Sequence, residues 1–291
     1  MSQRPLTRRA ALAAAAAAVS LSPGLRQLLA DQTRRFHIGA CDWSIGKRQH
    51  IEAFDVARQI GLDGVQVSFD EAGARYDLRK PEVRDEYAAA SKRTGVDICS
   101  LAMGVLNNRP YATDDEAEQW VSQCVDVMAA MGQKIVLLAF FGKGDILDRP
   151  DLQAKVVERL KKVAPKAEQA GVTLAIESWL DADTHLRMLD AIGSPAVKIY
   201  YDLGNMNKRG YDVYHELRRL GRDRICQIHT KEYGHLLGEG RVDYGKIKTA
   251  LDEIGWTGWL VIEGATVKGK PMPECYQHNQ RYLRSVFPTG S

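Results

Sequence analysis

The sequence predicts a single α/β domain, a (β/α)8 barrel of the TIM type, preceded by an N-terminal export signal. Between residues 36 and 287, eight short apolar runs alternate with longer helical patterns. Such an alternation over about 250 residues is typical of a (β/α)8 barrel. The apolar runs are nearly continuous, which favours strands buried on both faces of a parallel sheet. No linker or second domain is visible within this stretch.

The predicted strands are short and rich in β-branched or aromatic residues. Helical patterns lie between them, for example over residues 50–61, 81–95 and 151–171. Each of these three patterns ends in glycine, which is a common helix stop. We expect strands over residues 36–41, 64–69, 97–103, 134–140, 172–177, 197–202, 225–229 and 259–263.

A doubly wound open sheet is the alternative fold. Such a sheet more often has fewer strands and a glycine-rich phosphate loop after the first one. Here the first strand is followed by Cys41, Asp42, Trp43 and Ser44, without a G-x-G-x-x-G pattern. The longest irregular segment, residues 230–241, follows the seventh strand and contains three glycines. This position and composition are typical of a mobile active-site loop.

Residues 1–30 read as a bacterial twin-arginine (Tat) signal peptide. Thr7, Arg8 and Arg9 precede an alanine-rich run that ends at Val19, which is the polar, twin-arginine, apolar order of such signals. We therefore expect engagement of the Tat export machinery and a periplasmic or exported protein. The apolar run is shorter than the roughly 20 residues of a membrane span, so no stable membrane anchor is expected. A disordered or helical alanine-rich tail is the alternative.

Charge and composition argue against a nucleic-acid partner. The net charge is +3, but residues 1–30 carry four arginines and no acidic residue, which leaves 36 basic against 37 acidic residues in the body. A nucleic-acid-binding protein usually has a basic body. The five cysteines show no CxxC spacing, so no metal or redox motif is indicated by them.

Glu177, Asp202, His229 and Glu263 carry the strongest functional signal. Each ends a predicted strand, in the runs LAIE, KIYYD, CQIH and LVIE. A parallel barrel gathers the C-terminal ends of its strands around one mouth, where active sites form. Carboxylates there need a partner, because a buried unpaired charge is costly. Taken singly, each acid could instead cap the next helix or pair with Lys or Arg.

Together the four residues predict a site for one divalent cation. Three carboxylates and one imidazole, with room for substrate oxygens, favour Mn²⁺, Mg²⁺ or Co²⁺ over metals that prefer thiolates. Zn²⁺ is also compatible with this ligand set.

The chain resembles a known family in the segments LAIESW, YYDLGNMN, QIHTKEY followed by LLGEGRVDY, and LVIEG. It is similar to the xylose isomerase-like TIM-barrel superfamily, in the branch of sugar phosphate isomerases and epimerases. The resemblance covers residues 36–287 and is strongest from 172 to 264. It implies one Mn²⁺-type ion held by Glu177, Asp202, His229 and Glu263. It also implies that Glu177 and Glu263 are the catalytic acid/base pair, on opposite faces of the substrate carbon.

The chemistry of such a site can be followed without the family. A metal that polarises a sugar carbonyl and an adjacent hydroxyl acidifies the neighbouring C–H. One glutamate removes the proton, and a metal-bound enediolate forms. Return of the proton from the other face epimerises the centre, and return to the neighbouring carbon isomerises the sugar. We therefore expect an isomerase or epimerase that acts on a small sugar or keto-sugar.

Three positions depart from the epimerase pattern, and they concern substrate rather than metal. Where characterised ketose 3-epimerases carry a histidine, an arginine and a glutamate, this chain has Asn205, His235 and Asp183. Trp43 and Trp179 follow strand ends and could stack on a sugar face, and Lys231 could neutralise an enediolate. Loop packing or solvent exposure is the plain alternative for each. The predicted substrate-binding residues are His235, Asn205, Asp183, Trp179, Trp43 and Lys231.

Other functions fit the same residues less well or differently. A lyase or hydrolase of 3-keto-glycosides could use the same metal and bases to expel the glycosidic oxygen by β-elimination. A metal-dependent nuclease would need more histidines, and His229 is the single strand-end histidine. A periplasmic sugar-binding module is the alternative without catalysis. Because exported proteins meet mostly unphosphorylated sugars, we expect a free sugar, a keto-sugar or a glycoside as substrate.

Overall fold

All eight predicted strands are present in the computed structural model, which describes residues 35–288. Every predicted strand boundary agrees with the structure to within one residue. The predicted export signal at residues 1–30 lies outside the described residues. Among residues 35–288, no helix combines the length and the apolar character needed to cross a membrane. The strands are β1 (Phe36–Cys41), β2 (Gly64–Ser68), β3 (Asp97–Met103), β4 (Ile135–Phe140), β5 (Thr173–Ser178), β6 (Val197–Asp202), β7 (Ile225–Thr230) and β8 (Gly258–Ile262).

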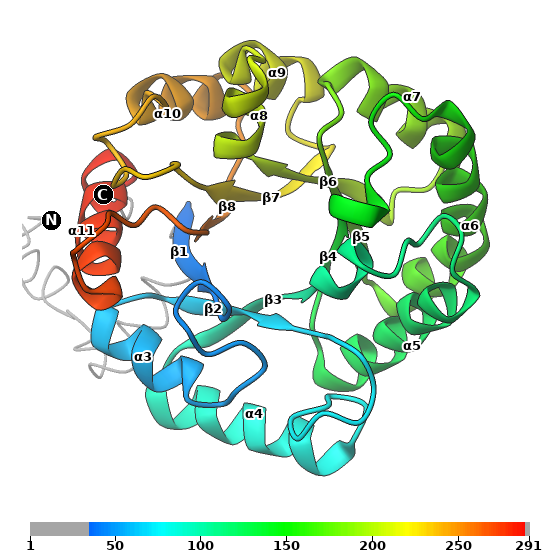
Figure 1. Cartoon of the computed structure of the whole chain (residues 1–291), viewed down its shortest axis with the longest axis horizontal. Helices are drawn as coiled ribbons and strands as arrows, with labels where there is room; N and C mark the ends of the chain where they lie inside the picture. Colours follow the sequence, from blue (N-terminus) through cyan, green and yellow to red (C-terminus); the bar gives the residue numbers. More distant parts are fainter. Residues whose placement is uncertain (1–34, 289–291) are drawn as a thin grey trace, which may run out of the picture. The chain divides into compact units, whose positions relative to one another are not determined.

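The strands form one closed parallel barrel. They pair in chain order from β1 to β8, and β8 pairs with β1 to close the ring. Figure 1 looks into the open end of the barrel and shows the helices arranged around the strands. The fold class predicted from the sequence, a single (β/α)8 barrel, is therefore confirmed. The register of β6 and β7 places Asp202 opposite His229, so the order of the strands already brings two of the four strand-end residues together.

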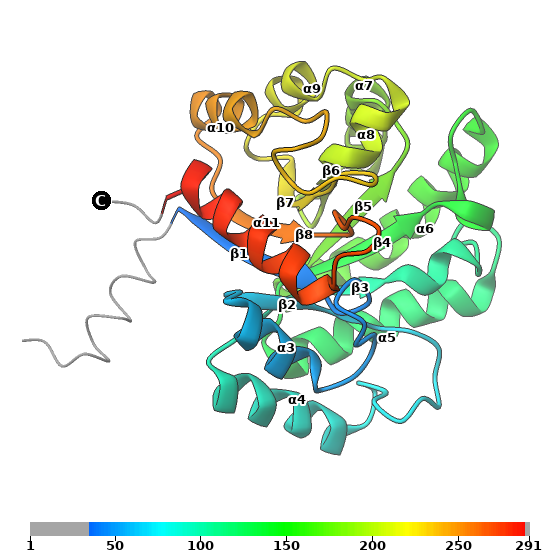
Figure 2. The same ribbon diagram turned by 60° about the vertical axis from the view of Figure 1, so that its left-hand side comes forward.

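Helices follow the strands and cover the outside of the barrel. The helix α6 ends at Gly171, whose φ of 63° is the left-handed conformation that glycine adopts freely. The last helix, α11, packs against α3 and against the first strand, β1, as Figure 2 shows. The helices are α3 (Ala53–Ile60), α4 (Pro81–Thr94), η1 (Gly104–Asn107), α5 (Asp115–Met131), η2 (Gly142–Gly144), α6 (Pro150–Ala170), α7 (Ala182–Ile192), α8 (Leu203–Arg209), α9 (Val213–Leu220), α10 (Tyr244–Glu253) and α11 (Met272–Val286).

Strand periodicity decides which side chains face the interior of the barrel. On β5, Leu174 and Ile176 belong to the main core between sheet and helices, whereas Ala175 belongs to a separate cluster. Side chains alternate between the two faces of a strand. Glu177 therefore shares the inner face with Ala175, and the same alternation applies to the other strand-end residues.

The segment after β7, residues 231–241, is anchored by contacts of its own residues. Leu236 and Leu237 are buried, and the backbone N–H of Leu237 donates to Asn279 Oδ1 at 2.9 Å. The carboxylate of Glu232 is also buried and accepts a hydrogen bond from the N–H of Val242 at 2.7 Å. These contacts hold the middle of the loop against the barrel, while His235 between them is exposed.

Candidate metal centre

The four strand-end residues converge on one point at the C-terminal mouth of the barrel. Glu177 lies in β5, Asp202 ends β6, His229 lies in β7, and Glu263 follows β8 directly. One potential ligand atom from each lies within 4.8 Å of the other three. The His229 ring is fully buried, and the Glu263 side chain, the most open of the four, is 19% exposed. The sequence spacing thus becomes a compact, largely dry group of oxygen and nitrogen ligands.

The imidazole presents one defined nitrogen to the carboxylates. His229 Nδ1 lies 2.9 Å from Glu177 Oε1, 3.8 Å from Asp202 Oδ2 and 3.6 Å from Glu263 Oε2. The other ring nitrogen, Nε2, points the opposite way, toward Gln66 Oε1 at 2.9 Å. Nδ1 is therefore the atom that would act as a ligand.

The two oxygens of Asp202 have different environments, and this provides a test of the metal assignment. Oδ1 accepts a hydrogen bond from the N–H of Asn205 at 2.8 Å and caps α8. Oδ2 is buried and has no hydrogen-bond partner among the described residues. A buried oxygen left in this state is costly unless a charge compensates it. Asp202 Oδ2 lies within the group formed with Glu177, His229 and Glu263. These four residues therefore fit one divalent cation that prefers oxygen ligands.

Lys231 supplies a positive charge beside the same carboxylates. Its Nζ lies 2.7 Å from Glu263 Oε2 and 3.7 Å from Asp202 Oδ2. Burial alone would lower the pKa of Lys231, but Asp202 and Glu263 outweigh it and raise the pKa above its usual value. The residue is therefore a permanent cation within the site.

The surroundings push the pKa values of two carboxyl groups in opposite directions. Burial raises the pKa of Asp202 to about 7, against the opposing charge of Lys231. Burial also acts to raise the pKa of Glu263, but His229 and Lys231 overcome it and bring the value to about 2. Divergent pKa values within one cleft are typical of sites that handle protons.

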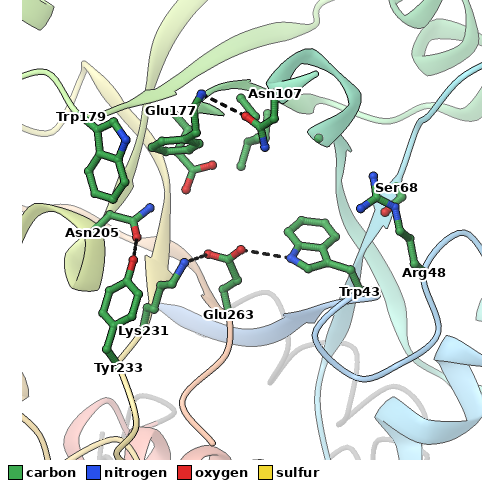
Figure 3. A pocket seen from close by; sticks show the side chains of 14 residues that line it. Trp43, Arg48, Ser68, Asn107, Glu177, Trp179, Asn205, Lys231, Tyr233 and Glu263 are labelled. Atoms are coloured by element: carbon green, nitrogen blue, oxygen red, sulfur yellow. Dashed lines mark hydrogen bonds and ion pairs between the residues drawn. The ribbon is translucent and has the colours of Figure 1, made fainter. Parts of the chain in front are cut away.

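A cavity of about 260 Å³ opens above the four residues. Figure 3 shows that Trp43, Lys231 and Glu263 lie on one side of it, with Glu177 and Asn107 across from them. The indole Nε1 of Trp43 donates to Glu263 Oε1 at 3.1 Å, so both oxygens of Glu263 have a donor. The remaining wall is mixed: the apolar side chains of Leu137, Ala139, Phe141 and Trp179 are joined by the polar ones of Arg48, Ser68, Asn205 and Tyr233.

The predicted substrate-binding residues divide into two groups. Trp43, Trp179, Asn205 and Lys231 line the cavity. Asp183 does not: six residues after Glu177 the chain is already in the first turn of α7, and its carboxylate pairs with Arg219 at 2.7 Å.

His235 is likewise outside the cavity lining, on the exposed part of the loop after β7. Asp183 and His235 are thus not among the residues that line the cavity, and contact of either with substrate stays a prediction. Six residues past the strand end, the chain lies in a helix in one case and in an anchored loop in the other.

Four polar residues of the cavity were missed by the sequence analysis: Arg48, Ser68, Asn107 and Tyr233. Ser68 ends β2 and Asn107 ends η1 just after β3, so the rule of strand ends could have identified both. Tyr233 has no such signal. Tyr233 is 41% exposed, its hydroxyl donates a hydrogen bond to Asn205 Oδ1, and Lys208 Nζ lies 4.0 Å from the centroid of its ring.

Comparison with known proteins agrees with the fold. An L-ribulose-5-phosphate 3-epimerase of Salmonella typhi is 26% identical over 235 residues, which cover 73% of this chain and 81% of the relative. The structure of D-psicose 3-epimerase from Clostridium cellulolyticum H10 superposes with a TM-score of 0.73 at 16% identity, over 86% of this chain and 99% of that one. A 3-keto-D-glucoside 4-epimerase from E. coli gives a TM-score of 0.70 at 17% identity, with the same coverage.

The model of the family described as xylose isomerase-like TIM barrel matches residues 54–286. This range contains seven of the eight strands and all four residues of the candidate metal centre. The chain belongs to the xylose isomerase-like TIM-barrel family.

Proposed function

We propose that this protein is a divalent-metal-dependent epimerase or isomerase of a sugar or keto-sugar, in which Glu177 and Glu263 exchange a proton with the substrate. The observation that carries the proposal is the convergence of Glu177, Asp202, His229 and Glu263 beneath a cavity the size of a small ligand. The sequence relative named above, an L-ribulose-5-phosphate 3-epimerase, supports the reaction class.

The two glutamates are suited to proton transfer by position. Both line the cavity, and both approach the centre from strands that are not neighbours, β5 and β8. When bound, the cation would polarise the carbonyl and hydroxyl oxygens of the sugar and acidify the adjacent C–H. Glu263 enters as a carboxylate, held by Trp43 and Lys231 through separate oxygens. Lys231 also offsets the negative charge that develops on the substrate when a proton is removed.

We propose Mn²⁺ as the ion, with Mg²⁺, Co²⁺ and Zn²⁺ as the other compatible cations. The ligand set of three carboxylates and one imidazole supports an oxygen-preferring metal. Export in the folded state would let the ion be loaded in the cytoplasm, before the protein meets metals that bind more tightly in the Irving–Williams order. Recovery of mainly zinc from protein isolated out of its native periplasm would contradict this part of the proposal.

The substrate that we propose is not phosphorylated. Two cations line the cavity, and each is already paired with a carboxylate: Lys231 with Glu263, and Arg48 with Asp70 through two hydrogen bonds of 2.7 Å. A phosphate would have to compete for both. An uncharged sugar instead meets indole rings and hydroxyl or amide groups, which are suited to its C–H faces and its hydroxyls.

We also propose that the protein is exported through the Tat pathway. The support is the order of residues 1–30 in the sequence. Replacing Arg8 and Arg9 together by lysine should leave the protein in the cytoplasm of the producing bacterium. An unchanged periplasmic fraction would remove this part of the proposal.

Cleavage of a 3-keto-glycoside by β-elimination is the second candidate reaction. The observation in its favour is a shallow hollow beyond Arg48, lined in part by Gln49, Asp70 and Asn108, which adjoins the main cavity. A sugar in the main cavity could extend an aglycone into that hollow. Proton removal by the same glutamates would then expel the glycosidic oxygen.

Incubation with keto-sugars and 3-keto-glycosides in D₂O distinguishes these reactions. With Mn²⁺ bound, NMR should detect deuterium at one substrate carbon, together with an isomer whose mass differs from that of the substrate only by the incorporated deuterium. Release of an aglycone would identify the elimination instead. The variants Glu177→Gln and Glu263→Gln should each reduce turnover by at least about 100-fold, since positioned acid/base groups contribute 10²–10⁴-fold. Binding of sugars without exchange at any carbon would contradict the proposal and indicate a binding protein.

A further inference from the structure

The ring of His229 is held from the far side of the barrel. Three of the four candidate ligands lie on β5, β6 and β7, and the fourth, Glu263, directly follows β8. The contact to Nε2 comes from Gln66 on β2, whose Oε1 lies 2.9 Å away. Gln66 and His229 are 163 positions apart in the chain and are both fully buried. One hydrogen bond thus crosses the interior and joins the two halves of the barrel beneath the metal centre.

Gln66 is itself fixed by its two neighbouring strands. In the sheet register it lies beside Cys41 of β1 and Ser100 of β3. Its amide nitrogen donates to Ser100 Oγ at 3.0 Å, and the thiol of Cys41 donates to its Oε1 at 3.2 Å. Cys41 and Ser100 are fully buried as well. The amide nitrogen is therefore used by Ser100, and the carbonyl oxygen is directed at His229.

This arrangement determines which nitrogen of the imidazole carries hydrogen. The carbonyl oxygen of Gln66 can only accept, so His229 must donate from Nε2. The Cys41 sulfur, 3.3 Å from the same nitrogen, is at most a weak acceptor and does not alter this. With hydrogen on Nε2, the lone pair of Nδ1, which lies 2.9 Å from Glu177 Oε1, is available to a cation between the three carboxylates. This is the tautomer that a metal ligand requires.

We propose that Gln66 is a positioning residue of the metal centre, which sets the tautomer and the rotation of the His229 ring through an acceptor anchored on Ser100. The proposal rests on the metal centre of the proposed function and extends it to the opposite half of the barrel. Hydrogen-bond partners of metal-bound histidines commonly change metal affinity by about 10–100-fold when they are removed.

Gln227 provides a matched control inside the same barrel. It is a second fully buried glutamine, and it lies on β7 two residues before His229. Among the described residues, no hydrogen bond joins its amide to any of the four candidate ligands. Gln66→Met and Gln227→Met both replace a buried amide by an apolar chain of similar length. Only the first removes a bond to His229.

The test measures binding of Mn²⁺ alone to the metal-depleted full-length protein, without any sugar, by calorimetry or by the spin-resonance signal of free Mn²⁺. Gln66→Met should weaken the affinity 10–100-fold, and Gln227→Met should change it less than threefold. Gln66→Glu keeps an acceptor at the same position and should restore most of the affinity. In the metal-depleted protein with ¹⁵N-histidine, at a pH where the His229 ring is neutral, the His229 signals should show hydrogen on Nε2 in the wild type and lose this fixed tautomer in Gln66→Met.

The outcomes separate this inference from the proposed function. If the wild type binds no divalent ion, the proposed function fails with it. If the wild type binds Mn²⁺ and Gln66→Met binds equally well with an unchanged tautomer, only the role of Gln66 is overturned. Should Gln66→Met not fold, Ser100→Ala serves instead, because it frees the Gln66 amide from its anchor. That variant should weaken Mn²⁺ binding severalfold, and an unchanged affinity would overturn the inference.

Discussion

At the scale of single residues, Lys231 decides the charge balance of the site. Its ammonium group lies against Glu263 and Asp202 and is only 17% exposed. Removal of one partner from a largely buried ion pair leaves the other charge uncompensated, at a cost of about 3–5 kcal/mol. Because a bound cation supplies the same charge, the effect of such a change depends on whether metal is present.

Lys231→Met should destabilise the metal-free protein by about 3 kcal/mol and should bind Mn²⁺ more tightly, since a competing positive charge is gone. Added Mn²⁺ should restore most of the lost stability while turnover stays low. Denaturant unfolding with and without the ion measures both effects. Lys246→Met, which removes an exposed pair with Asp243, is the control and should cost at most about 1 kcal/mol. Equal losses in the two variants would contradict the charge-balance interpretation.

Tyr233 is a cavity residue to which no signal in the sequence points. Its hydroxyl bonds Asn205, and its ring borders the mouth of the cavity. Tyr233→Phe keeps the ring and removes one hydrogen bond, a net contribution of about 1 kcal/mol. We expect a severalfold rise in KM with kcat nearly unchanged, as measured by steady-state kinetics on the identified substrate. Tyr214→Phe is the control, because that hydroxyl bonds the N–H of Asp243 outside the cavity lining. A larger effect on kcat than on KM would contradict this and indicate that Tyr233 takes part in the catalytic step.

Prediction from sequence succeeds for residues whose position follows from strand ends. The convergence of Glu177, Asp202, His229 and Glu263 needs only the barrel topology and the two-residue alternation of strands. Asp183 and His235 were selected because they stand where ketose 3-epimerases carry a glutamate and an arginine, and side-chain direction in a helix or loop does not follow from such a match. Gln66 could not be predicted either, because its partner across the interior depends on barrel closure.

At the scale of secondary structure, one residue joins a strand to a helix and also completes the site. Asp202 ends β6, caps α8 through Oδ1 and leaves Oδ2 for a metal. The two readings of a strand-end acid, helix cap and ligand, thus hold at the same time. The close turn requires Gly204, since a Cβ there would lie 2.6 Å from the carbonyl oxygen of Lys231.

Substitution of Asp202 can separate capping from ligation. Asp202→Asn keeps an acceptor for the cap, so the metal-free protein should fold with nearly unchanged or improved stability, whereas Mn²⁺ affinity should fall by at least about 100-fold. Asp202→Ala loses the cap as well and should unfold about 1 kcal/mol more easily than Asp202→Asn. Calorimetry and thermal unfolding measure the two quantities. Similar stability of the two variants would show that the cap contributes nothing.

Secondary structure itself was largely predictable. The runs at residues 36–41, 97–103 and 197–202 match β1, β3 and β6 as predicted, because buried parallel strands have a strong apolar signal. The helix α8 was hidden, since its seven residues follow β6 without a connecting loop. Short helices of this kind have too little periodicity to be detected from sequence.

At the scale of the whole barrel, the site couples folding to pH and to metal. The folded-state pKa of Asp202, about 7, lies above the value of 3.8 for an ordinary aspartate. The metal-free folded protein therefore binds more protons than the unfolded chain between these values. Its stability falls on this account as the pH rises from about 4 to 7. A bound cation stabilises the ionised carboxylate of Asp202 and offsets this loss of folding stability.

We expect the increase in Tm caused by saturating Mn²⁺ to be larger at pH 8 than at pH 5.5, because at the lower pH the ion must displace a proton from Asp202. Thermal unfolding at matched metal concentration measures this difference. Binding to the folded state raises stability by about 2.7 kcal/mol at a ligand concentration of 100 times Kd, so the effect is well within range. In Asp202→Asn the difference should shrink. A larger shift at pH 5.5 than at pH 8 would contradict the assignment.

The central claim is that Glu177, Asp202, His229 and Glu263 hold one divalent cation. Anomalous diffraction from crystals grown with Mn²⁺ tests it most directly. The expected result is one strong peak at the mouth of the barrel, ligated by His229 Nδ1, Asp202 Oδ2 and one oxygen from each glutamate, with Lys231 moved away from the ion. A map at full Mn²⁺ loading without a peak between these four side chains, or with the ion bound elsewhere, would contradict the account.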